Sequence, residues 1–228
     1  YTIFVFIHTK IERYINNHLP LINMSHNDRD IDAGELFELL TSISKYVEQE
    51  LHLYALGGTA LTILKIKPST LDVDINIDNE KEYDYLCKIF GEIGFERKAP
   101  YRWFTQEGLA FDLFHGSNIL GTQLLHDCLT KSRFVQSFGK IKLYTLSPYD
   151  IIISKLARGE TRDFNDIQDT LKHEKLNVIE LIKRYKETME TSIVSEYKQK
   201  LLDLIEIKFK EWKFQIDEKL IGEVKKWN

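Results

Sequence analysis

Two aspartates near the middle of the chain have the residue type and spacing of a metal-binding pair. Asp72 and Asp74 alternate with Val73 and Ile75 in a segment that reads as a strand. Successive side chains of a strand point to opposite faces, so both carboxylates share one face. Neighbouring carboxylates raise each other's pKa unless a cation lies between them, and divalent metals prefer carboxylate oxygens. The pair therefore predicts a metal site, with two acids that simply face water as the alternative.

A third acid, Asp112, stands alone in the apolar segment AFDLF. A lone carboxylate is costly to bury without a partner. Asp112 is therefore either a surface residue of an edge strand or a third metal carboxylate. Adjacent strands lie about 4.8 Å apart, which would bring all three acids within reach of a common ion. We favour the metal site because of the upstream pair.

Paired glycines precede a helix about a dozen residues before the acid pair. A short apolar run ends at Gly57-Gly58, and Thr59 opens an apolar helical segment. Glycines at a helix start allow backbone N–H groups to approach a phosphate. A tight turn with no ligand is the alternative.

The motifs that carry a family resemblance occur in a fixed order. GGTAL, STLDVDI and AFDLF are similar to the signature of the DNA polymerase β-like nucleotidyltransferases: a GG or GS turn, an acid pair on the next strand and a later third acid. The segments KPSTLDVDI and SKLARGETRDFNDI resemble motifs of minimal nucleotidyltransferases related to AbiEii-type toxins. The resemblance covers roughly residues 53–170. Lys67 and Pro68 stand where many relatives carry an arginine.

The resemblance implies an α/β (α+β) fold: a nucleotidyltransferase-type mixed β-sheet flanked by helices, followed by a helical C-terminal part. It implies transfer of NMP from an NTP to a hydroxyl, with Mg²⁺ or Mn²⁺ as cofactor. Asp72, Asp74 and Asp112 would be metal ligands and catalytic residues. Lys155 would be catalytic and reach a phosphate, while Asp163 would orient or pair with basic groups. The implied nucleotide-binding residues are Gly57, Gly58, Thr59, Ser69, Thr70, Lys155 and Asp163.

The partners implied by the resemblance are a nucleoside triphosphate, an acceptor on tRNA or a protein, and an antitoxin. The locally basic segment 129–163 could contact an anionic acceptor. One alternative is a non-catalytic nucleotide-binding or protein-interaction module on the same fold, although all three acids are retained. A glycosyltransferase with an Asp-x-Asp grip is a second alternative, but it requires neither the glycine turn nor the third acid.

Periodicity and capping residues predict the elements that position these motifs. A capping box at Asp32 and Glu35 indicates a helix start. Ser147-Pro148 and Gly159 bound a later helix. The other expected elements are strands 53–56 and 71–77, helices 59–66 and 80–93, hairpins 102–106/109–115 and 134–138/141–146, a short helix at 122–132, a strand or tail at 1–7, a helix through residue 171 and helices from 178 onward.

Length and composition are those of a soluble globular protein. The chain has 228 residues, 43% apolar and 29% charged, with a net charge of −4 that argues against wholesale nucleic-acid binding. Cys87 and Cys128 form no CxxC pair, which suits a reducing cytoplasm, and no apolar run reaches the roughly 20 residues of a membrane span. We expect an N-terminal extension at 1–34, a nucleotidyltransferase core at 35–146 and a helical domain at 147–228.

Overall fold

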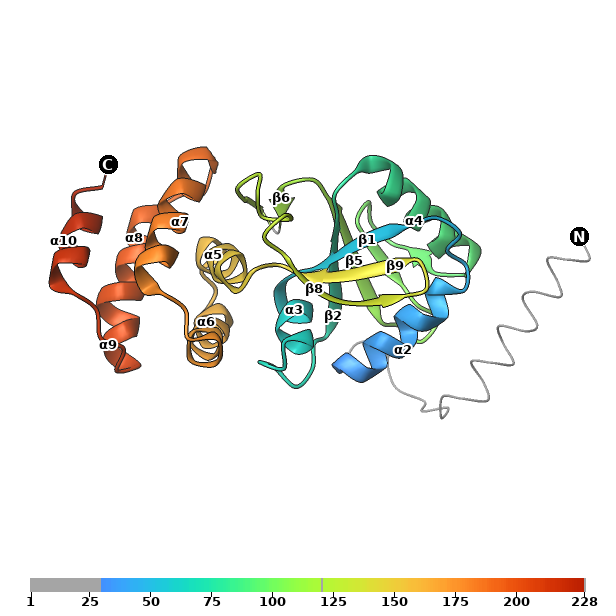
Figure 1. Cartoon of the computed structure of the whole chain (residues 1–228), viewed down its shortest axis with the longest axis horizontal. Coiled ribbons are helices and arrows are strands. Elements are labelled where there is room, and N and C mark those ends of the chain that lie inside the picture. The colour runs from blue at the N-terminus through green and yellow to red at the C-terminus, as the bar shows by residue number, and fades with distance from the viewer. Residues whose placement is uncertain (1–29, 120, 228) are drawn as a thin grey trace, which may run out of the picture.

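The computed structural model of the protein describes residues 30–119 and 121–227 (Figure 1). The strand or tail expected at residues 1–7 lies outside the described residues. Within them, no helix has both the length and the apolar character needed to cross a membrane.

A seven-stranded mixed sheet forms the centre of the fold. β1 pairs in parallel with β9, and β2 pairs in parallel with β5, while the other neighbours are antiparallel. The predicted mixed sheet flanked by helices is confirmed. In spatial order the strands are β3 (Glu96–Arg97), β4 (Arg102–Phe104), β5 (Ala110–His115), β2 (Asp72–Ile77), β1 (Leu51–Ala55), β9 (Ile141–Thr145) and β8 (Arg133–Phe138).

Helices α2 (Ala33–Ser44) and α4 (Glu80–Glu92) lie together on one side of this sheet (Figure 1). The capping box of α2 is confirmed, since Asp32 accepts from the Glu35 N–H at 2.9 Å and Glu35 accepts from the Asp32 N–H at 3.2 Å. Apolar side chains of both helices and the sheet fill the space between them. They include Leu40, Ile43, Leu53, Ile75, Leu86, Phe90, Phe111 and Leu113. Because strand side chains alternate, the acids of β2 and β5 point to the opposite face.

The helices after the sheet extend away on the other side (Figure 1). Ser147 caps α5 by accepting from the Asp150 N–H, Pro148 takes the first position, and Gly159 ends the helix with φ +75°. These boundaries are as predicted, because each residue supplies what a helix end needs. The helices are α5 (Pro148–Arg158), α6 (Thr161–Glu174), α7 (Val178–Thr191), α8 (Tyr197–Leu202), the π-helical η1 (Asp203–Lys208), α9 (Phe209–Glu211) and α10 (Glu218–Lys225).

The expected helix at 122–132 is wrong. The segment holds the two-residue strand β7 (Thr122–Gln123), which pairs with β6 (Asn118–Ile119), followed by turns. Leu124 and Cys128 are buried, and the Asp127 carboxylate is held by α7. Long-range contacts therefore override the weak local helical preference.

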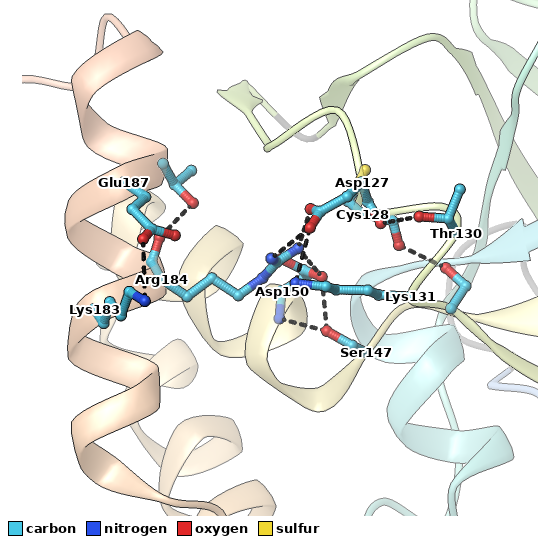
Figure 2. Close-up of polar contacts among 11 residues, drawn as sticks. Asp127, Cys128, Thr130, Lys131, Ser147, Asp150, Lys183, Arg184 and Glu187 are labelled. Atoms are coloured by element: carbon cyan, nitrogen blue, oxygen red, sulfur yellow. Dashed lines mark hydrogen bonds and ion pairs between the residues drawn. The ribbon is translucent and has the colours of Figure 1, made fainter.

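The contact from α7 centres on Arg184, a buried arginine that joins three parts of the chain (Figure 2). Its Nε donates to Asp150 Oδ1 at 2.7 Å and its Nη2 to Asp127 Oδ1 at 2.9 Å. Ser147 Oγ donates to Asp150 Oδ2 at 2.6 Å, and Lys131 pairs with Asp127 at 2.8 Å. Hydrogen bonds from Arg184 lower the pKa of Asp127 to about 2. The cluster fixes α7 and the 124–132 turns on the start of α5.

We expect Arg184→Ala to destabilise the fold by about 3–5 kcal/mol, because it leaves the fully buried carboxylate of Asp150 without its countercharge. Denaturant unfolding at neutral pH measures the loss. Lys183→Ala is the matched control, since that side chain is 76% exposed and pairs only along the helix with Glu187, at 3.8 Å. The control should change stability by less than about 0.5 kcal/mol. Equal effects of the two substitutions would contradict a structural role for the cluster.

Candidate active site

The three predicted acids meet at one point on the face of the sheet opposite α2 and α4. Asp74 and Asp112 are direct partners in the parallel pairing of β2 and β5. Asp72, Asp74 and Asp112 each offer a carboxylate oxygen, and these oxygens lie within 4.8 Å of one another. Asp74 and Asp112 are buried, whereas the Asp72 side chain is 39% exposed. The cluster has one open side and a geometry suited to a hard cation.

The turn from β1 into α3 (Gly57–Ile63) holds the acid-bearing strand in place. The buried Thr59 hydroxyl accepts from the Asp74 N–H at 2.9 Å and donates to the Asp72 carbonyl at 3.1 Å. The Leu56 N–H donates to the Asp74 carbonyl at 3.0 Å. Thr59 therefore positions the acids through their backbone, and only its own N–H remains for a nucleotide.

The two glycines have different local reasons. Gly57 has φ +48°, which favours glycine. A Cβ on Gly58 would lie 2.6 Å from Thr70 Oγ1, so close packing requires a glycine there whether or not a phosphate binds. In the described part of the chain, no acceptor bonds the N–H groups of Gly57, Gly58 or Thr59. Phosphate binding by these groups stays a prediction.

Excess negative charge shows in the pKa of Asp74. Burial raises it, Asp72 and Asp112 raise it further, and the result is about 7. Lys155 and Arg158 act in the opposite direction but do not cancel the effect. A divalent cation among the three acids would relieve this repulsion. The donor set and its charge thus fit Mg²⁺ or Mn²⁺.

Arg102 is the main residue of the site that the sequence did not reveal. It pairs across β4 and β5 with Asp112, and its Nε and Nη2 donate to Asp112 Oδ1 and Oδ2, both at 2.6 Å. This bidentate contact raises the pKa of Arg102 further. The signal was present in the predicted hairpin, because a turn at Glu107-Gly108 brings position 102 opposite position 112.

Lys155 lies in a buried ion network. Its Nζ is 2.6 Å from Asp166 Oδ2 and 3.5 Å from Asp163 Oδ1, and its side chain is 4% exposed. Burial alone would raise the pKa of Asp163, but hydrogen bonds from Arg158 and the charges of Lys155 and Arg158 lower it overall. Lys155 is thus not the surface lysine that was the alternative. Asp163 pairs with basic groups, while a contact between Lys155 and phosphate stays a prediction.

The segment before β2 is tied to the entrance of α2. The Ser69 hydroxyl contacts the Asp30 carboxylate. Thr70 and Ile31 exchange backbone hydrogen bonds of 2.7 and 2.9 Å. Lys67, at the position where many relatives carry an arginine, pairs with Asp166 at 3.2 Å. Nucleotide contacts of Ser69 and Thr70 stay predictions.

The basic residues of segment 129–163 are largely paired with acids. Lys131 pairs with Asp127, as described above. The other pairs are Arg133 with Glu174, Lys142 with Glu50, Arg158 with Asp163 and Arg162 with Glu160. Most of the positive charge counted in the sequence is therefore neutralised locally, which weakens the expectation of a basic wall for an anionic acceptor.

With this fold and acid cluster, the chain belongs to the family described as nucleotidyltransferases of unknown function (DUF6036), whose model matches residues 34–216. A candidate nucleotidyltransferase from Thermotoga maritima is similar in structure at 17% identity with a TM-score of 0.43, over 62% of this chain and 96% of that one. An antigenic nucleotidyltransferase-like protein from Paracoccidioides brasiliensis has 12% identity and a TM-score of 0.47, over 86% of this chain and 100% of that one. No curated protein matches the chain. Closeness to the AbiEii-type enzymes stays a prediction.

We expect Asp74→Asn to stabilise the metal-free protein at pH 8. The Asp74 pKa is about 7 in the fold against 3.8 for the model group. The folded protein therefore binds the extra proton between these values and loses stability as the pH rises through them. Asn does not ionise, so its advantage should grow from pH 4 to pH 8 toward about 4 kcal/mol, from roughly three pK units at 1.36 kcal/mol each.

Thermal or denaturant unfolding in the presence of a chelator tests this pH dependence. Asp84→Asn is the control, because Asp84 is an exposed aspartate outside the cluster. A stability difference between Asp74→Asn and wild type that stays constant from pH 4 to pH 8 would show that charge repulsion does not act on Asp74.

Proposed function

We propose that the protein is a metal-dependent nucleotidyltransferase that transfers NMP from an NTP to a hydroxyl of an RNA or protein acceptor. Membership of a nucleotidyltransferase family supports the reaction class. The observation that carries the proposal is the convergence of Asp72, Asp74 and Asp112, whose carboxylate oxygens lie within 4.8 Å of one another. The Asp74 pKa of about 7 supports a cation as their common ligand.

The three acids would hold Mg²⁺ or Mn²⁺ on the open face of the sheet. A bound divalent ion supplies charge neutralisation for the triphosphate and alignment of the attacking hydroxyl. Asp112, at the centre of the pairing between β2, β5 and β4, would also accept the proton of the acceptor hydroxyl. Asp72, the most exposed of the three, would face the incoming nucleotide.

The phosphate side of the site would be the start of α3. The backbone N–H groups of Gly57, Gly58 and Thr59 emerge directly beside the acid-bearing strand, since Thr59 bonds the backbone of both acids. Lys155 would supply positive charge near Asp74, and Asp163 would hold it in place. Ser69 and Thr70 complete the proposed nucleotide contacts.

The proposed acceptors and an antitoxin partner follow the resemblance to AbiEii-type toxins. A stable, neutralised surface in segment 129–163 favours acceptor recognition at the acid cluster itself rather than by a long basic groove.

Incubation of the protein with each α-³²P-labelled NTP, Mg²⁺ or Mn²⁺, and total cellular RNA or protein tests the proposal. We expect label to pass to one acceptor class, and Asp72→Ala/Asp74→Ala to reduce the transfer at least 10³-fold, in line with losses on removal of key catalytic groups. Asp84→Asn is the matched control and should retain wild-type transfer, because it removes an exposed carboxylate outside the cluster.

Transfer that survives the double substitution would remove the three acids from the catalytic assignment. Nucleotide binding without transfer to either acceptor class would favour the alternative of a non-catalytic binding module on the same fold. Equilibrium binding of each NTP, measured beside the transfer assay, separates these outcomes.

A further inference from the structure

The guanidinium of Arg102 lies among the acids that we propose as metal ligands. Its two bonds to Asp112 engage both carboxylate oxygens at 2.6 Å, and its Nη2 is 3.7 Å from Asp72 Oδ2. In the described part of the chain, these two acids are the carboxylate partners of Arg102. An arginine thus occupies the oxygens that a metal would need.

The guanidinium and a divalent ion cannot share Asp112 without strong repulsion. Metal–oxygen distances are about 2.1 Å for Mg²⁺, so the ion would approach the oxygens that Arg102 already contacts. Two cations that close repel strongly where little water screens them. Binding of one therefore weakens binding of the other.

Arg102 is also the partner that can move. Its side chain is 39% exposed, whereas that of Asp112 is 7% exposed. Its backbone is held between neighbouring strands, with the Arg102 N–H bonded to the Ala99 carbonyl at 3.2 Å and its carbonyl accepting from Lys98 at 3.0 Å. Side-chain rotation alone can thus release Asp112, and rotation of exposed side chains is fast.

The other cations near the cluster are bound elsewhere. Lys155 is held by Asp166 and Asp163, and Arg158 is held by Asp163. These carboxylates are not proposed metal ligands, so metal binding leaves both cations paired. Only the release of Arg102 follows from occupation of the acid cluster. A planar guanidinium freed at this edge suits bidentate binding of phosphate oxygens.

We infer that Arg102 is the resident counter-cation of the metal-free site, which the metal displaces from Asp112 and which then binds a phosphate oxygen of the nucleotide. The inference rests on the proposed function and adds a coupling to it: metal entry creates a phosphate ligand. Arg102 then acts first as a competitor of the metal and later as a positioning residue for the triphosphate.

The test compares wild type with Arg102→Gln in two titrations. In the first, Mn²⁺ alone is titrated without nucleotide and followed by the electron paramagnetic resonance of the free ion. Removal of the competing cation should tighten Mn²⁺ binding by about tenfold or more, as expected for loss of a charge-assisted hydrogen-bonded competitor. The gain should vanish in Arg102→Gln/Asp112→Asn, because the ligand that is freed is then absent.

The second titration adds inorganic triphosphate, a probe that is independent of the base, in saturating Mn²⁺. Arg102→Gln should weaken triphosphate binding by about tenfold, because the released arginine is missing. A purely structural residue would not change the two affinities in opposite directions. Arg102→Lys keeps the charge but loses the planar fork, and it should give intermediate shifts if Arg102→Gln does not fold.

Each remaining outcome overturns a defined part. Unchanged or weaker Mn²⁺ binding by Arg102→Gln, with wild-type binding that Asp74→Asn abolishes, rejects the counter-cation and leaves the proposed metal site intact. Tighter Mn²⁺ binding with unchanged triphosphate affinity rejects the later role of Arg102. Absence of Mn²⁺ binding by wild type and Arg102→Gln alike rejects the metal site itself, and the inference with it.

Discussion

The concentration of three carboxylates at one point of a sheet is the constraint on which the rest of the site depends. Direct pairing of Asp74 with Asp112 and the nearby Asp72 raise the pKa of Asp74 to about 7. Such repulsion opposes folding unless cations surround it. The fold supplies positive charge from two directions, with Arg102 from the β4–β5 hairpin and Lys155 from α5. A metal-free site that is costly to assemble is also one with a strong free-energy gain on binding a divalent ion.

The geometry of the acids is maintained by backbone contacts behind them. Thr59 bonds to both sides of Val73, so the start of α3 and the acid-bearing strand move as one unit. Gly58 allows Thr70 to pack within a distance that a Cβ would not permit. The apolar side chains of β2 meanwhile pack under α2 and α4. One strand therefore has a fully apolar face and a highly charged face, which explains why its alternation is so regular.

Helix α5 connects the helical part to the acid cluster. Near its first turn, Asp150 is held by Arg184 of α7, and near its last turn Lys155 acts on Asp74 by its charge. The position of Lys155 relative to the acids thus depends on how α5 is docked. The Arg184 cluster in Figure 2 contributes to that docking from a distance, because it also fixes the turns around Asp127. Structural and proposed catalytic ion pairs share one helix.

The sequence by itself determined the local features: the alternation that places Asp72 and Asp74 on one face, the caps at Asp32 and Ser147, and the β4–β5 hairpin. These depend on backbone stereochemistry and on neighbours within a few residues. The tertiary structure alone decided that β5 pairs in parallel with β2, that Arg102 binds Asp112, and that Arg184 holds segment 124–132 as turns rather than a helix. Strand order and ion pairing join residues far apart in the chain. Their free energies depend on burial and distance, which no local pattern of residues encodes.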